Sequence, residues 1–412
     1  MLLVCEWLLM TYRLVSMEVG RPLTINDDDC EVQEPTPVDD EYIQPNGVVQ
    51  PQAGISQPSG LVPVIPVVRL YAQLKKTLKY PTISGATLAT FDGHFQSIMS
   101  TYPEPFPISS QAQLDPRLLT AACSLPTAQF FLYRHNLSPA CTRAERRDAL
   151  DRCVAVANDT VRYIRRSMQQ DSRSGFGGMY LPGHMQHWAA RLRTMAPAFF
   201  CSHLWRCALI LCLRLEFASA STIVQASASI GDLKKNNTAC GRNLAFFIDR
   251  LIGHLRSGST RESLEEDEEM LAYASGDLQA SVEEAWAWIG SETGANLSKR
   301  SNGRTPVERS NSVSESQTSS ALSEREIHEW GGWDNILRTL DQLHQQQQGQ
   351  IPPPQAQMYA QPPGTYPPPP HTPNLHLAPQ PSSGQIQLPA LSPVGSNNGS
   401  NGSTRIDIKN LM

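Results

Sequence analysis

The chain has 412 residues, a formal net charge of −5 at pH 7 and 18% charged residues, so its balance is mildly acidic. This argues against a chain that binds nucleic acid by itself, because phosphate binding requires a clustered basic surface. The 32 prolines and 26 glycines, with many of the prolines after Gln350, indicate that much of the chain is not packed core.

The first predicted element is a helix over Leu2–Met17 that is apolar on most of its circumference. At about 100° per residue, Glu6, Arg13 and Ser16 fall on one narrow polar stripe, so we expect the other faces to be buried. The Gly-Arg-Pro sequence that starts at Gly20 ends this helix. Because nothing precedes residue 1 to cover such a helix, we expect the chain to be the C-terminal part of a longer product.

An acidic loop that ends in a cysteine follows this stop and reads LTINDDDCEV over residues 23–32. Helix, stop and loop together resemble the regulatory region of fungal zinc-cluster transcription factors, in which an apolar helix precedes LGRP and I-x-D-D-D-C-D-V. Val19 and Glu31 are conservative departures from that pattern. The strong match is confined to this stretch and the prolines after it, and a looser one extends to about residue 290. The matching residues are Gly20, Arg21, Pro22, Leu23, Ile25, Asp27, Asp28, Asp29, Cys30 and Val32.

The resemblance implies a nuclear regulator of RNA polymerase II transcription, with residues 1–30 as the C-terminal piece of the family's xylanolytic-activator-type regulatory core. It also implies a six-cysteine cluster that binds two zinc ions, and a coiled coil that makes the full-length protein a homodimer on DNA. None of those cysteines is in this chain, so we expect DNA binding and zinc to belong to a missing N-terminal domain and no cofactor on these residues.

Residues 31–62 are punctuated by proline and glycine and are predicted to be a linker. Helical periodicity then returns and continues to about residue 290. Thr142-Arg-Ala-Glu145 is a capping box, which predicts a helix start. With no sustained strand alternation, residues 63–290 are predicted to form an all-α, multi-helix regulatory domain. Apolar residues recur at helical spacing over 67–78, 88–98, 150–164 and 244–255.

Two apolar segments resemble membrane signals. Met1–Met10 has no positively charged start and contains a glutamate, so we do not expect a secretory signal. Ala196–Phe217 is interrupted by His203, Arg206 and Arg214, whereas a membrane span needs about 20 predominantly apolar residues. We therefore expect no membrane association.

Three groups of residues have spacings that occur in metal or enzyme sites. Asp27–Asp29 suggests magnesium, as in helical terpene synthases, but the run lies in a loop and lacks a second metal motif, so a structural acidic loop is favoured. His184 with His187, and His203 with Cys207, lack a third ligand, which favours satisfied histidines. The nine cysteines show no C-x-x-C spacing and are expected to be reduced thiols of an intracellular protein. We predict no catalytic, cofactor or metal residues, and no enzyme activity.

The acidic block Glu262–Glu269 runs into three bulky apolar residues, Met270, Leu271 and Tyr273. Acidic residues beside bulky apolar ones are typical of activation segments that bind coactivators. Charge runs are more often solvated, and carboxylates also complement the N-terminal end of a helix. We therefore favour a solvated helix start for this block over an activation segment.

The C-terminal part, residues 291–412, is rich in Ser, Pro and Gln and is predicted to be a disordered tail. A short amphipathic island over residues 330–343 interrupts it. An amphipathic helix in such a setting folds onto a partner, here a transcriptional coactivator, or it docks back on the helical body or has no role. The alternative function is a helical adaptor or scaffold that acts through partner binding without DNA contact. The predicted partner-binding residues are Trp330, Trp333, Ile336, Leu337, Leu340 and Leu343.

Overall fold

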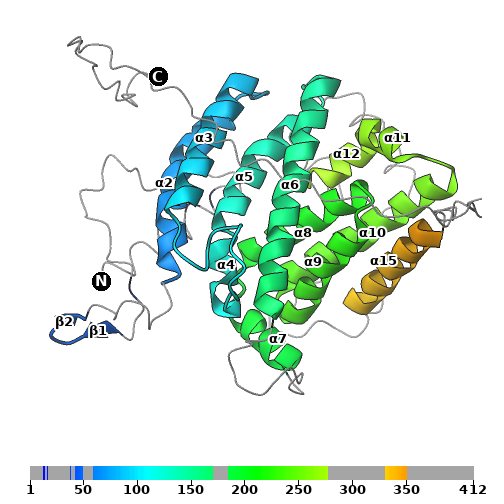
Figure 1. Ribbon diagram of the computed structural model, residues 1–412. Coiled ribbons are helices and arrows are strands. Elements are labelled where there is room, and N and C mark those ends of the chain that lie inside the picture. The colour runs from blue at the N-terminus through cyan, green and yellow to red at the C-terminus, as the bar shows by residue number, and fades with distance from the viewer. Residues whose placement is uncertain are drawn as a thin grey trace, which may run out of the picture. The chain divides into compact units, whose positions relative to one another are not determined.

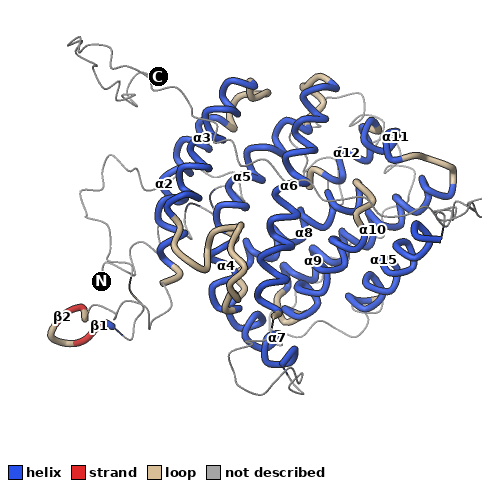
Figure 2. The backbone as a smooth tube through the Cα atoms, in the orientation of Figure 1, coloured by secondary structure: helices blue, strands red, loops and turns tan. Residues whose placement is uncertain are grey.

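The computed structural model describes residues 13, 16, 38, 42–49, 59–169, 184–276 and 330–349. These residues belong to one unit of the chain, Met1–Pro353. They are almost entirely helical (Figure 2), which confirms the all-α prediction. Within them the only sheet is a two-residue antiparallel pair, β1 (Ile43–Gln44) and β2 (Gly47–Val48), in the predicted linker.

In the N-terminal half of the helical body, α2 and α3 pack against α5, and α5 packs against α6 (Figure 1). The predicted capping box starts α6, where the Glu145 amide donates to Thr142 Oγ1 at 3.3 Å and the Thr142 amide donates to Glu145 Oε2 at 2.8 Å. Ser84 caps α3 by accepting from the amide of Thr87. The elements are α2 (Leu61–Thr77), α3 (Gly85–Thr101), η3 (Pro116–Leu118), α4 (Leu119–Ala122), α5 (Ser124–Arg134), η4 (His135–Leu137) and α6 (Arg143–Met168).

The C-terminal half is organised around α8, which packs against α6, α9, α10 and α12. Almost all residues of α8 are buried, because the helix is apolar on every side. Seven of the nine cysteines are among the described residues, and all seven are buried and outside any disulfide. The elements are α7 (His184–Met195), α8 (Ala198–Leu213), α9 (Phe217–Ile230), α10 (Lys235–Arg256), α11 (Arg261–Glu266), α12 (Glu268–Ala274) and α15 (Gly332–Gly349).

None of the helices in the described ranges is by itself long and apolar enough to cross a membrane. The pair α7 and α8 meets that criterion only jointly, by length and composition, with a bend of 117° between the two helices.

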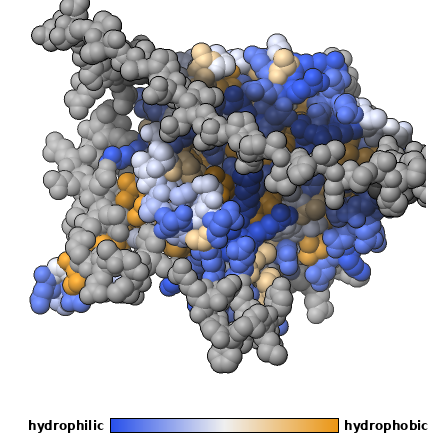
Figure 3. All heavy atoms as spheres, in the orientation of Figure 1, coloured by the Kyte–Doolittle hydropathy of each residue, from blue (hydrophilic) through white to orange (hydrophobic). Residues whose placement is uncertain are grey.

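The exposed surface of the described residues carries few large apolar side chains. Most of the face shown in Figure 3 is hydrophilic where it is coloured. The exposed apolar residues are scattered along the sequence, and three of them belong to the β1–β2 hairpin and the residue after it. They are Ile43, Val48, Val49, Tyr80, Met185, Met195 and Leu233.

Two residues of the polar stripe predicted on the first helix, Arg13 and Ser16, are buried. Arg13 and Ser16 are both helical, and only 1% and 4% of their surfaces are exposed. Arg13 Nη1 donates to the carbonyl of Val68 in α2 at 2.9 Å, and Lys75 Nζ donates to the carbonyl of Ser16 at 3.2 Å. A buried guanidinium requires acceptors of this kind. At these two residues α2 therefore covers the polar side of the predicted helix as well, and it supplies their hydrogen-bond partners.

Candidate functional site

The residues predicted to bind a partner lie on α15 and just before it, and α15 packs along α9 and beside α10 (Figure 1). Their side chains face the helical body. Leu337 is half-buried and packs against the same core. Of the alternatives that the sequence leaves open, the structure shows the helix docked on the body. The exposed fractions are 9% for Trp330, 7% for Trp333, 2% for Ile336, 0% for Leu340 and 8% for Leu343.

The buried residues of α15 form a single seam. Trp333, Ile336, Leu340 and Leu343 follow one another at intervals of three or four residues, which places them on one side of a helix. The helical domain and the island predicted within the tail therefore share one hydrophobic core. The opposite side of α15 is polar and exposed, and carries Asp334, Asn335, Arg338, Asp341 and Gln342.

A glycine of α10 admits the two tryptophans. The Trp330 and Trp333 rings meet edge to face, with centroids 5.3 Å apart and planes at 88°. Both rings lie against Gly241, where a Cβ would be 2.7 Å from Cη2 of Trp330 and 3.0 Å from Cζ2 of Trp333. Because Cβ atoms essentially never come within 3.0 Å of another heavy atom, any other residue at position 241 would force the Trp330 ring to shift. We call the faces of α9 and α10 that contact α15, with Gly241, the α15-binding surface.

The indole N–H groups of Trp330 and Trp333 are buried and have no hydrogen-bond acceptor among the residues that the structure describes. A buried donor without an acceptor costs about 1–3 kcal/mol. Trp205 of α8 differs, since its Nε1 donates to Asn243 Oδ1 at 3.0 Å. The docking of α15 is thus stabilised by apolar burial and opposed by two unsatisfied donors.

Two polar contacts lie farther along α15. Ser221 Oγ of α9 donates to Asp341 Oδ1 at 3.3 Å, and Gln347 Nε2 donates to the carbonyl of Leu215 at 3.2 Å. Leu215 lies in the turn between α8 and α9 and has φ of 59°, a left-handed backbone conformation that residues other than glycine rarely adopt. These contacts fix the position of α15 along α9, but both are long and at least partly open to solvent.

The acidic block Glu262–Glu269 spans α11 and the start of α12 and is paired with arginines. Arg143 Nη2 is 2.6 Å from Glu266 Oε2, and Arg146 Nη1 is 2.7 Å from Glu268 Oε1. The block therefore belongs to an ion-pair network between α6 and the α11–α12 region. The apolar residues that an activation segment would present are covered. They are Met270, Leu271 and Tyr273, with exposed fractions of 0%, 1% and 8%.

The pair His203 and Cys207 lies in the interior of α8. His203 Nε2 is 3.0 Å from Thr160 Oγ1 of α6 and 3.6 Å from Cys207 Sγ. Burial, together with the charge of Arg206, lowers the pKa of His203 to about 3, so the ring is neutral at pH 7. Burial raises the pKa of the Cys207 thiol to about 12, so the thiol is neutral at pH 7. His203 is a satisfied core histidine, as the sequence predicts.

The second histidine pair, His184 and His187, lies at the start of α7, and His187 is exposed. In the part of the chain that the structure describes, no group of three or more His, Cys, Asp or Glu residues is placed to hold a metal ion.

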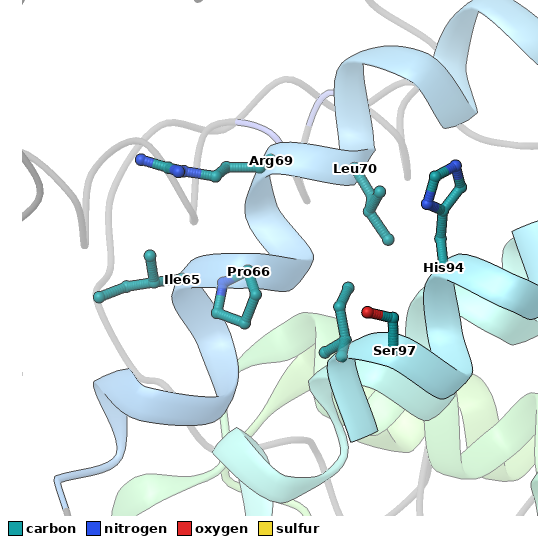
Figure 4. A pocket seen from close by; sticks show the side chains of 7 residues that line it. Ile65, Pro66, Arg69, Leu70, His94 and Ser97 are labelled. Atoms are coloured by element: carbon teal, nitrogen blue, oxygen red, sulfur yellow. The ribbon is translucent and has the colours of Figure 1, made fainter. Parts of the chain in front are cut away.

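A shallow cavity of about 300 Å³ separates α2 from α3 (Figure 4). Its polar residues, Arg69, His94 and Ser97, are all exposed. Sites for small ligands instead place a few polar groups inside a largely enclosed apolar pocket. The α15-binding surface is therefore the stronger candidate site. The apolar lining of the cavity consists of Ile65, Pro66, Leu70 and Ile98.

The residues of the family motif lie outside the described ranges, so their geometry does not enter the site. No protein-family model, curated protein or solved structure matches this chain. The resemblance to zinc-cluster transcription factors accordingly rests on the sequence alone. The motif residues concerned are Gly20, Arg21, Pro22, Asp27, Asp28, Asp29 and Cys30.

Proposed function

We propose that this chain is the regulatory part of a fungal zinc-cluster transcription factor, which acts on RNA polymerase II transcription in the nucleus. The six-cysteine zinc cluster of that family is not among the 412 residues, so DNA contact is not assigned to them. In this proposal the helical body controls transcription and α15 supplies the contact with the transcription machinery. The sequence resemblance over residues 20–32 supports the family assignment.

The observation that carries the regulatory role is the docking of α15. A helix with a seam of aromatic and aliphatic residues is the form in which short segments enter a hydrophobic groove of a partner. In α15 this seam, which includes Trp333, Ile336 and Leu340, is covered by the body. A coactivator could bind the seam only after α15 leaves the body.

The two arrangements of α15 then act as the two states of a switch. When α15 is docked, its seam is unavailable and transcription stays low. When α15 is released, the seam recruits a coactivator. A partner or signal that binds only the released state shifts the population toward it by the difference between its affinities for the two states.

A reporter assay with the full chain fused to a heterologous DNA-binding domain tests this proposal. The variant Gly241→Leu removes the space for Trp330 without altering α15, and we expect it to raise reporter expression several-fold over the wild type. Adding Trp333→Ala and Leu340→Ala to that variant should return expression to the baseline. Gly253→Ala is the matched control in the same helix, since nothing lies within 4 Å of a Cβ at that position.

A reporter that never departs from the level of the DNA-binding domain alone, in the wild type and in Gly241→Leu, would refute a role in transcription. A release of α15 measured in solution without any reporter change would favour the second candidate.

That second candidate is a helical adaptor without DNA contact, and the charges of α6 are compatible with it. Three of its arginines, Arg143, Arg146 and Arg152, are paired with carboxylates rather than gathered into a basic patch. Under this alternative, Gly241→Leu increases the binding of a protein partner through the α15 seam while the tethered reporter stays silent.

A further inference from the structure

The connection between α12 and α15 begins and ends near the same part of α10. Gly276, just after α12, lies against Trp205, and a Cβ there would be 3.2 Å from the indole Cη2. Trp205 donates its hydrogen bond to Asn243 of α10. Two residues earlier in that helix, Gly241 contacts Trp330 at the start of the α15 segment. A short connection would therefore be enough to join the two ends.

The actual connection is far longer than that gap. Residues 277–329 separate the two ends, and at about 3.3 Å per residue an extended chain of this length spans well over 100 Å. Such a length allows α15 of one copy to reach the α15-binding surface of another. When identical copies exchange an identical element, the contacts between chains are the same as those within a chain.

The α15-binding surface also selects this particular helix. Its defining feature is the glycine that receives two adjacent indole rings, Trp330 and Trp333, followed by apolar contacts along α9. A second copy of the chain carries an identical helix, which can make the same contacts with this surface. The two unsatisfied indole N–H groups lower the net stability of docking, which makes the helix easier to exchange.

We propose that two copies of this chain exchange α15 reciprocally, so that the α15-binding surface of each copy holds α15 of the other. The resulting pair is isologous and closed, since each copy gives one helix and receives one. The proposal does not depend on a role in transcription, because it concerns only the contact between α15 and the α9–α10 faces.

The test uses two full-length variants with complementary defects. Gly241→Leu cannot accept α15 but carries an intact helix. The double variant Trp330→Ala/Trp333→Ala cannot donate α15 but carries an intact surface. Native mass spectrometry and light scattering measure the species formed by each variant alone and by the mixture.

We expect each variant alone to be monomeric and the mixture to form a 1:1 complex, with an affinity at least tenfold tighter than the self-association of either. The wild type should dimerise only at higher concentration, because its own α15 competes in each copy. When the Gly253→Ala variant takes the place of the Gly241→Leu variant in the mixture, the tighter association should disappear. If Gly241→Leu fails to fold, Gly241→Ala is the milder variant, and alanine is favoured over glycine in a helix.

A mixture that remains monomeric would overturn the proposal, and so would dimers that form equally well in both single variants. A synthetic peptide of residues 328–349 provides a second measurement. Binding of this peptide to the donor-defective chain, but not to its Gly241→Leu derivative, supports exchange through the α15-binding surface. Peptide binding that ignores Gly241 contradicts it.

Discussion

The contact between α6 and α8 and the contact between α15 and the α9–α10 faces both bury apolar side chains almost completely. They differ in how they accommodate polar groups. Between α6 and α8, Thr160, His203 and Cys207 lie within hydrogen-bond reach of one another. Under α15, the indole N–H groups of Trp330 and Trp333 have no acceptor in the described ranges. Equal burial therefore does not mean equal stability of the two contacts. We expect the α15 contact to open at a lower free energy than the α6–α8 contact.

The largest expected effect comes from truncating one buried leucine of the helical body and one of α15. Leu209 of α8 and Leu340 of α15 are both 0% exposed. Leu209→Ala should lower the free energy of unfolding of the helical body by about 2–5 kcal/mol, the usual cost of such a cavity. Leu340→Ala should detach α15 and leave the unfolding of the body nearly unchanged.

Denaturant unfolding measures the body in both variants, and amide hydrogen exchange of residues 333–349 measures α15. Equal losses of unfolding free energy in Leu209→Ala and Leu340→Ala would show that α15 is as integral to the core as α8. The distinction between the two contacts would then be wrong.

The polar group of the α6–α8 contact predicts a dependence on pH. The pKa of His203 is lowered from 6.5 to about 3 in the folded state, chiefly by burial. Below pH 6.5 the unfolded chain therefore binds a proton that the folded chain does not, so stability is lost as the pH falls from 6.5 toward 3. At about 1.4 kcal/mol per pH unit below 6.5, the loss is about 2 kcal/mol at pH 5.

Unfolding experiments between pH 7 and pH 4 measure this slope. His203→Gln should flatten it, whatever its effect on stability at pH 7. His187→Gln is the control, because His187 is an exposed histidine. A slope that survives His203→Gln would assign the acid sensitivity to other groups.

The sequence predicted the helices of the body well, because their apolar periodicity and caps are local signals. The capping box at Thr142 and the apolar stripe from Leu244 to Leu251 are examples, and both produced the expected elements. The seam of α15 was also predicted as an amphipathic helix. The sequence could not decide whether this helix docks on the body, because the fit between a helix and a surface distant in sequence leaves no periodic signal.

Gly241 is the residue that the helical pattern did not point to. An isolated glycine inside a helix costs about 1 kcal/mol relative to alanine, so its presence indicates a close approach by another group. The sequence contained that signal, but not the identity of the group. The burial of Arg13 and Ser16 was missed for a similar reason, since their partners Val68 and Lys75 lie on another helix.

A smaller effect is expected from exchanging tryptophan for phenylalanine in the two regions. Trp333→Phe removes a buried N–H that has no acceptor, and should strengthen the docking of α15 by up to about 1 kcal/mol. Trp205→Phe removes an N–H that is bonded to Asn243, and should lower the stability of the body by about the same amount. Hydrogen exchange of α15 and unfolding of the body measure the two effects. Effects of the same sign would mean that the difference in polar satisfaction does not govern attachment.

The smallest effect is expected from the hydrogen bond between Ser221 and Asp341. The bond is 3.3 Å long and exposed, so Ser221→Ala should change the protection of α15 by less than about 0.5 kcal/mol. Ser229→Ala is the control in the same helix, because its hydroxyl donates within α9 to the carbonyl of Gln225. If Ser221→Ala released α15 as fully as Leu340→Ala, a polar anchor would hold the helix. The free energy of releasing α15 would then depend chiefly on that one hydrogen bond, and the unsatisfied indole N–H groups would contribute little to it.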